Sequence, residues 1–322
     1  MEPLLRFLEP ATEPLDGGTA RDRYRGALLG LGVGNVLGGP LEGYSAAQIE
    51  RAIPGGVRDV HPREVGAPWD DDVAQAIELA EALLEPEFDP DAYLQRLVRW
   101  LEEGGRGIGR QTFQVLSRAR AGARGTEAAR TVWEESGRQA AGNGAVMRCA
   151  PVGLRWRRDP VRLVEDAGHQ ARVTHYDPRC VWTAVSTCAA LAHALAGTHW
   201  TLHELADGLS QAGAPDEVGT AVRLAATGDL AELRLDEPYS MGYTIRTMTA
   251  GLWAFLNARS YEQTVLAVIN AGGDTDTNGA VAGAMLGARY GASAIPERWL
   301  GALPDRAGME RLADRLLEAA SV

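Results

Sequence analysis

Apolar residues recur every three or four positions along nearly the whole chain from Arg21 onward, and this periodicity constrains the fold most strongly. Val73, Ala76, Ile77 and Ala80 are one example. The same spacing predicts helices over residues 76–84, 91–103, 126–133, 177–196, 244–256, 262–270 and 309–319. No segment shows the strict alternation or the evenly spaced β-branched runs that indicate strands. The pattern therefore predicts an all-α fold, a compact bundle of many helices.

The first 20 residues differ from the rest of the chain. Glu-Pro occurs at positions 2–3, 9–10 and 13–14, and proline is excluded from helix interiors. We therefore expect residues 1–20 to form an extended N-terminal leader. Residues 21–322 contain no long linker and no internal repeat, so they predict a single domain. The N-terminus lacks the basic start of a secretory signal, and no apolar run reaches the ~18 residues of a membrane helix.

All 32 basic residues are arginine, and the chain has no lysine. This excludes lysine Schiff bases, Walker-type phosphate loops and protein-kinase sites, although a coding bias toward arginine is enough to explain it. The net charge of −11 argues against broad nucleic-acid binding, so nucleic acid is not an expected partner. A membrane is not an expected partner either, because no apolar run is long enough to span one. Cys149, Cys180 and Cys188 form no C-x-x-C pair, which predicts buried thiols in a reducing cytoplasm.

The most informative segment runs from Gly272 to Thr277, with the sequence Gly-Gly-Asp-Thr-Asp-Thr, and precedes a helix rich in small residues. A single Asp or Thr here is an ordinary helix N-cap, but one cap needs only one such side chain. The small residues behind the turn indicate that the start of the helix is buried. Because several acids at a buried turn repel one another unless a cation joins them, Asp274, Asp276 and Thr277 are candidate metal ligands.

A second acidic turn, Asp70-Asp71-Asp72, lies directly before the helix predicted over residues 76–84. Seen alone, it is also consistent with a solvated turn at the positive end of a helix dipole. Together the two turns supply five carboxylates and one threonine hydroxyl. Oxygen ligands without histidine or cysteine companions favour Mg²⁺, Mn²⁺ or Ca²⁺ over zinc, and this many acids can hold two ions.

Residues 25–43 are rich in glycine, and Gly30 to Gly34 superficially match a dinucleotide-binding loop. No strand precedes them and the spacing differs from that fingerprint, so tight helix packing is the better interpretation for most of these glycines. Glu42 is the one acid of this segment that we expect to project into a site.

Two further turns are candidates for ligand binding. The Gly142-Asn143-Gly144 turn opens a predicted helix and offers backbone N–H groups to an anion such as a pyrophosphate, although a plain turn with a cap fits equally well. His175 precedes the helix predicted over residues 177–196, where a capping or packing role competes with a catalytic one.

Taken together, these segments resemble the ADP-ribosylglycohydrolase family, which includes the dinitrogenase reductase-activating glycohydrolases. The matching pieces occur in the family's order at residues 25–30, 37–43, 70–72, 142–148, 174–175 and 272–277, and the last is the most specific. The resemblance implies an all-α, orthogonal multi-helix bundle of this family's type. It also implies a centre of two Mg²⁺ ions, with Mn²⁺ as an alternative. The implied reaction is hydrolysis of the N- or O-glycosidic bond between ADP-ribose and a protein side chain or a small conjugate.

The resemblance implies roles for individual residues as well. The implied metal ligands are Asp70, Asp71, Asp72, Asp274, Asp276 and Thr277. The implied catalytic residues are Glu42, Asp72 and Asp274. The implied substrate-binding residues are Asn143, Gly144, Ala145, His175 and Tyr243.

The chain departs from the family's pattern at several of these positions. Asp70 stands where threonine is usual, Val73 replaces a threonine, Asn35 replaces an aspartate, and Gly107 replaces the aspartate of an Asp-Ile-Gly motif that accompanies ADP-ribosyl-arginine specificity. Two alternatives to a hydrolase of modified proteins therefore stay open. One is an enzyme for small ADP-ribose conjugates, and the other is a non-catalytic ADP-ribose-binding or structural protein.

Overall fold

The structure, a computed structural model, describes residues 1–8, 16–196 and 201–321. Within these ranges the chain forms helices joined by short turns, and it has no strand beyond two isolated β-bridges. The all-α prediction is confirmed. The helices are α1 (Glu2–Phe7), α2 (Gly17–Gly38), α3 (Ala46–Ala52), α4 (Asp71–Ala82), α5 (Pro90–Glu102), α6 (Arg110–Arg120), α7 (Glu127–Glu135), α8 (Ala150–Arg155), α9 (Pro160–Arg172), α10 (Pro178–Ala196), α11 (Leu202–Gln211), α12 (Asp216–Leu224), α13 (Thr244–Leu256), α14 (Tyr261–Asn270), α15 (Thr275–Tyr290), α16 (Glu297–Leu300) and α17 (Arg306–Ala319).

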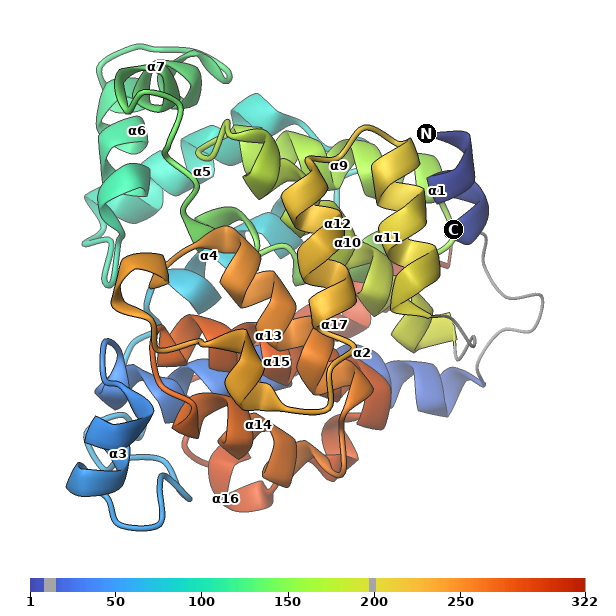
Figure 1. The fold of residues 1–322 in the computed structure, drawn as a ribbon. Coiled ribbons are helices and arrows are strands. Elements are labelled where there is room, and N and C mark those ends of the chain that lie inside the picture. Colours follow the sequence, from blue (N-terminus) through green and yellow to red (C-terminus); the bar gives the residue numbers. More distant parts are fainter. Residues whose placement is uncertain (9–15, 197–200, 322) are drawn as a thin grey trace.

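Helices α2 and α15 pack against each other along the centre of the molecule (Figure 1). Both carry glycine at every fourth position, which places these residues on one face of each helix. The glycines pair in opposite directions along the two helices, as Gly26 with Gly287, Gly30 with Gly283, and Gly34 with Gly279. At each pair a Cβ atom would overlap a carbonyl oxygen of the opposite helix. We call these six residues the glycine seam; tight packing is the structural reason for them.

Just beyond the glycine seam, contacts with the end of α2 fix the position of the start of α15. The hydroxyl of Thr275 donates a hydrogen bond of 2.8 Å to the carbonyl oxygen of Gly38, the last residue of α2. A Cβ on Gly38 would in turn clash with the carbonyl group of Thr275. The first turn of α15 is therefore held directly beside the last turn of α2.

Two acidic helix starts differ from the sequence-based bounds. Helix α4 begins at Asp71 rather than at residue 76, so Asp70 is its N-cap and Asp71 and Asp72 lie in its first turn. Helix α15 likewise starts at Thr275, with Asp274 as its N-cap. Neither cap side chain accepts a hydrogen bond from its own helix, so these carboxylates do not act as ordinary caps.

The prediction of an extended leader is wrong for residues 2–7, which form α1, and α2 already begins at Gly17. Proline occupies an early position of α1, where the missing N–H costs nothing. Leu4 is fully buried, and α1 packs beside α11 (Figure 1). Residues 9–15 of the leader lie outside the described residues, and the single-domain assignment of residues 21–322 stays a prediction.

Among the described helices, none is long and apolar enough to cross a membrane.

Candidate metal centre and substrate cavity

A cavity of about 560 Å³ lies where the end of α2 meets the starts of α4 and α15. Its wall is formed by residues of the segments 35–42, 70–72, 106–112, 142–147, 241–242 and 274–277, together with Glu64 and His175. Its volume falls in the range of about 300–1,000 Å³ that is usual for small-molecule sites. All the acids singled out from the sequence line this cavity.

Glu42 reaches the cavity because two turns pair side by side. The N–H of Gly273 donates to the carbonyl oxygen of Tyr44 at 2.7 Å, and the N–H of Gly43 donates back to the carbonyl oxygen of Gly273 at 2.9 Å. Gly273 has a φ of +84°, and a Cβ there would run into the backbone of Leu235, so only glycine fits this turn. The pairing places Glu42 next to Asp274.

The acids form two groups that share one member. Oxygens of Glu42, Asp274 and Asp276 lie within 4.8 Å of one another, and so do oxygens of Asp70, Asp72 and Asp276. Asp276, which is buried, therefore stands between the two groups. This geometry can hold metal ions, and the shared acid suits two neighbouring ions.

The hydrogen bonding of these acids supports a cation site. One oxygen each of Asp70, Asp72 and Asp276 is buried and has no hydrogen-bond partner among the described residues. A buried carboxylate without a partner is costly, and a metal ion supplies the missing interaction. The donors are all oxygen atoms, so the residues fit hard cations such as Mg²⁺, Mn²⁺ or Ca²⁺.

The electrostatics of the two groups lead to the same conclusion. Burial and the neighbouring charge of Asp274 hold the pKa of Asp276 well above its usual range. Burial and the charges of Asp276 and Asp70 do the same to the pKa of Asp72. Desolvation, then the charges of Asp274 and Asp70, raise the pKa of Glu42. A divalent cation among these groups offsets their mutual repulsion.

Two of the expected ligands, Asp71 and Thr277, are not members of these two groups of acids. Asp71 lines the cavity but belongs to neither group; it faces Gly107, where a Cβ would lie 2.8 Å from its carboxylate oxygen. Gly107 has a φ of +81°, so a larger residue there would be strained in this arrangement. Thr277 contacts the second group through Asp72, 3.5 Å from its hydroxyl.

The expected substrate-binding residues are divided between the cavity and the structure behind it. Asn143, Gly144 and His175 line the cavity. The amide of Asn143 donates to Asp274 at 2.8 Å and to Thr247 at 3.0 Å, which joins this turn to the acids. The expectation that the turn offers free N–H groups is wrong for Asn143, whose own N–H donates to the carbonyl oxygen of Gly242 at 2.9 Å.

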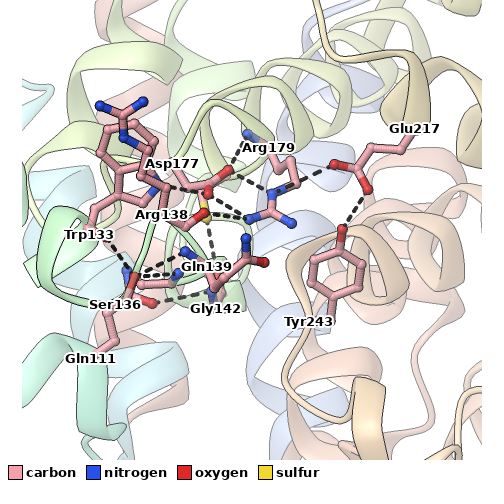
Figure 2. Close-up of polar contacts among 12 residues, drawn as sticks. Gln111, Trp133, Ser136, Arg138, Gln139, Gly142, Asp177, Arg179, Glu217 and Tyr243 are labelled. Atoms are coloured by element: carbon pink, nitrogen blue, oxygen red, sulfur yellow. Dashed lines mark hydrogen bonds and ion pairs between the residues drawn. The ribbon is translucent and has the colours of Figure 1, made fainter.

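Ala145 and Tyr243 do not line the cavity. Ala145 is fully buried, and its carbonyl oxygen accepts a hydrogen bond from Gln170 at 3.0 Å. The hydroxyl of Tyr243 donates to Glu217 of α12 at 2.9 Å (Figure 2). The guanidinium carbon of Arg179 lies 5.8 Å from the centre of the Tyr243 ring. Tyr243 is therefore held in a polar network beside the cavity.

This network also fastens α7 to the start of α10. Arg179 donates to Asp177 at 2.7 and 2.8 Å and lies 3.7 Å from Glu217. Trp133 of α7 donates from its indole nitrogen to Asp177 at 2.8 Å (Figure 2). The start of α10 also contacts the turn at residues 142–145, because the thiol of Cys180 donates to the carbonyl oxygen of Gly142 at 3.2 Å.

Sequence reasoning missed several residues of the cavity wall. Glu64, Arg106, Gln111 and Met241 line it, and no motif marks them. Arg148 lies behind the wall and is fully buried. In the sequence it is the last residue of the matching segment 142–148, where no role was assigned to it.

The chain is similar to known proteins in both sequence and fold. Residues 16–322 match the family model for ADP-ribosylglycohydrolase. A solved structure described as an ADP-ribosylglycohydrolase-related protein complex shares 33% identity, with a TM-score of 0.76 over 94% of this chain and 99% of that chain. The ADP-ribosylarginine hydrolase Tri1 of Serratia proteamaculans is 29% identical over 92% of this chain and 79% of its own length. The ADP-ribosyl-(dinitrogen reductase) glycohydrolase of Rhodospirillum rubrum is 27% identical over 96% of this chain and all of its own length.

Proposed function

Because the chain belongs to the ADP-ribosylglycohydrolase family, we propose that it hydrolyses the glycosidic bond between ADP-ribose and an acceptor in a magnesium-dependent reaction. The observation that carries this proposal is the shared position of Asp276 between two groups of acids at one end of the cavity. The acceptor is a protein side chain or a small conjugate.

In this proposal two Mg²⁺ ions are held by Asp70, Asp72, Asp274, Asp276 and Thr277, with Asp71 beside them and Mn²⁺ as an alternative metal. When bound, the ions supply positive charge that neutralises the carboxylates, polarises water and orients the ribose hydroxyls. Charge balance supports this assignment, because ADP-ribose carries a negative pyrophosphate that an uncompensated cluster of carboxylates would repel.

The chain's own residues supply the remaining chemistry. Glu42 accepts a proton from the attacking water as general base, a role that Asp72 or Asp274 takes if Glu42 is a ligand. The bond from the ribose anomeric carbon to the acceptor nitrogen or oxygen breaks and its electron pair leaves with the acceptor. The water oxygen joins the anomeric carbon, and its proton ends on the acceptor. Ionised carboxylates around the ribose stabilise the positive charge that develops as the bond stretches.

Other residues position the substrate in this scheme. Asn143, Gly144 and His175 contact the ADP-ribose from the cavity wall, while Ala145 and Tyr243 support them from behind. Glu64 pairs with Arg106 at 3.3 Å on the same wall.

The test is release of ADP-ribose from ADP-ribosyl-arginine, ADP-ribosyl-serine and small conjugates, with Mg²⁺ and with EDTA. We expect turnover of at least one of these substrates that EDTA abolishes and Mg²⁺ restores. Asp276→Asn is expected to lower kcat by at least about 100-fold, as loss of a principal electrostatic group does. Asp91→Asn, at an exposed aspartate of α5, serves as the matched control. Full turnover by Asp276→Asn, or turnover unaffected by EDTA, would refute the assignment.

The same assay separates the remaining alternative, a non-catalytic ADP-ribose-binding or structural protein. That alternative requires tight ADP-ribose binding without product at any metal concentration. No observation favours it here. A cytoplasmic location also stays a prediction.

A further inference from the structure

Thr174 lies between a buried arginine and the histidine of the cavity wall. Arg148 donates from Nη2 to the hydroxyl oxygen of Thr174 at 2.7 Å, and that oxygen is 2.8 Å from Nδ1 of His175. Arg148 and Thr174 are completely buried, and the exposed fraction of His175 is only 2%. Water therefore does not compete for the hydrogen bonds within this triad.

The direction of the second hydrogen bond follows from the donors present. An arginine has donors only, so the hydroxyl oxygen of Thr174 accepts from Arg148. The hydroxyl hydrogen of Thr174 then needs an acceptor. Among the described residues, Nδ1 of His175 is the only group within reach that can accept it. If Nδ1 carried the proton instead, the buried hydroxyl hydrogen would have no acceptor, at a cost of about 1–3 kcal/mol.

Arg148 is itself held rigidly. Its Nε donates to the side chain of Gln170 at 3.1 Å, Nη1 to the side chain of Gln75 at 2.6 Å, and Nη2 to the backbone carbonyl of Gln170 at 2.9 Å. No ion pair joins it to a carboxylate of the described chain, so its positive charge stays largely uncompensated beside the histidine. Burial and this charge lower the pKa of His175 to about 3, which keeps the imidazole neutral at physiological pH.

We propose that Arg148 and Thr174 are positioning residues that fix His175 as the neutral tautomer with its proton on Nε2. The other ring nitrogen then presents an N–H donor to the cavity. Nε2 lies against the turn at residues 142–144, since Cβ atoms built on Gly142 and Gly144 would lie 3.3 and 3.0 Å from it. It has no hydrogen-bond partner among the described residues and is available to an acceptor oxygen of a ligand. That the ligand is ADP-ribose rests on the proposed function.

The fixed position of the His175 ring explains why glycine faces it. A Cβ on Gly144 would lie 2.5 Å from Cε1 of His175, so a side chain there would displace the ring from Thr174. Glycine at this position and the hydroxyl of Thr174 together define where the Nε2 donor points.

The tautomer can be read directly, without substrate or turnover. Long-range ¹H–¹⁵N correlation spectra of ¹⁵N-labelled protein distinguish the two neutral forms, and the spectrum of His175→Gln assigns the signals among the six histidines. We expect the wild-type protein to show protonated Nε2 and bare Nδ1. Protonated Nδ1 in the wild type would overturn the proposal, even if no Thr174 variant folds.

Variants at Thr174 then test the positioning role. Thr174→Val removes the hydroxyl at nearly constant volume and is expected to give a mixture of tautomers and roughly tenfold weaker binding of ADP-ribose, the loss of about one hydrogen bond. Thr174→Ser keeps the hydroxyl and is expected to retain the wild-type tautomer and affinity. A wild-type tautomer and affinity in Thr174→Val would refute the role. Failure of the hydrolase assay leaves the tautomer result intact, so the two proposals fail separately.

Discussion

Gly34 of α2 and Gly279 of α15 meet backbone to backbone, and a Cβ on Gly34 would overlap the carbonyl oxygen of Gly279. Neither helix can yield by moving a side chain, because main chain faces main chain. The Gly34→Ala variant is therefore expected to lower the free energy of unfolding by about 2 kcal/mol or more, as overpacking of a dense core does.

Urea unfolding followed by circular dichroism measures this loss. The control is Gly17→Ala in the same helix, where nothing lies within 4 Å of a new Cβ. That variant is expected to be unchanged or slightly more stable, because alanine is the better helix former. Equal stability of the two variants would mean that α2 and α15 separate at no cost.

Mg²⁺ is expected to stabilise the protein more strongly as the pH rises. The pKa values of Asp72 and Asp276 are raised in the fold, so the folded state binds these protons more tightly than the unfolded chain. Ionisation above about pH 4 then destabilises the metal-free protein, and a bound divalent cation offsets that loss.

Thermal unfolding in EDTA and in Mg²⁺ between about pH 4.5 and 7.5 tests this prediction. The rise in Tm caused by Mg²⁺ should grow across the range and should be smaller in Asp276→Asn. An increase in Tm that is independent of pH and equal in both proteins would place the ion elsewhere.

His175 is expected to make stability fall on acidification. With a folded-state pKa of about 3, below its ordinary value of 6.5, the residue binds fewer protons in the folded than in the unfolded state. Its stabilising contribution is complete above pH 6.5 and is lost as the pH falls toward 3. Between about pH 7 and pH 5 this amounts to about 2 kcal/mol.

Urea unfolding at the two pH values should therefore show that His175→Gln loses about 2 kcal/mol less than the wild type. His203→Gln, at an exposed position, should follow the wild type. If all three proteins respond alike, His175 is not buried as a neutral ring.

Asn143 is expected to act on turnover through Asp274, to which its amide donates at 2.8 Å. Groups that orient metal ligands typically change activity 10- to 100-fold, so Asn143→Ala should lower kcat by about that factor in saturating Mg²⁺. The control Thr247→Val removes the second acceptor of the same amide and leaves Asp274 untouched. An equal loss in both variants would show that the contact to Asp274 is not the important one.

Glu42 can be tested as a base rather than a ligand. Glu42→Gln should lower kcat by about 10²- to 10⁴-fold, the usual contribution of a general base. The Mg²⁺ concentration needed for half-maximal activity should stay within about twofold of the wild type, a shift too small for a lost ligand. A large shift in that concentration would instead assign Glu42 to the metal.

The sequence predicted the acidic end of this cavity well. The spacing of Asp274 and Asp276 and the run of acids at Asp70 indicate the acids of each turn, because one short turn fixes the positions of neighbouring side chains. The grouping across turns, with Asp276 shared, is seen only in the structure. The helical class was predicted equally well from apolar periodicity. The early start of α4 was missed because Asp71 and Asp72 carry no apolar pattern of their own.

Contacts between segments that are distant in the sequence could not be predicted from it. Tyr243 directly follows Gly242, which lines the cavity, yet its hydroxyl donates a hydrogen bond to Glu217 of a separate helix. The partners of Arg148 come from α4, from α9 and from Thr174 just after α9, and no local pattern connects them. A buried cation is recognisable in the sequence only as an anomaly, and its role depends on which helices surround it.

The glycine seam has a consequence for how such a site changes over evolution. The distance between the end of α2 and the start of α15 is set by touching main chains, whose dimensions are the same whatever the sequence. Drift in the surrounding apolar side chains therefore leaves Asp276 and Asn35 at a constant separation. A single methyl group added within the seam alters that separation, so purifying selection should also act on the seam glycines, although none of them lines the cavity.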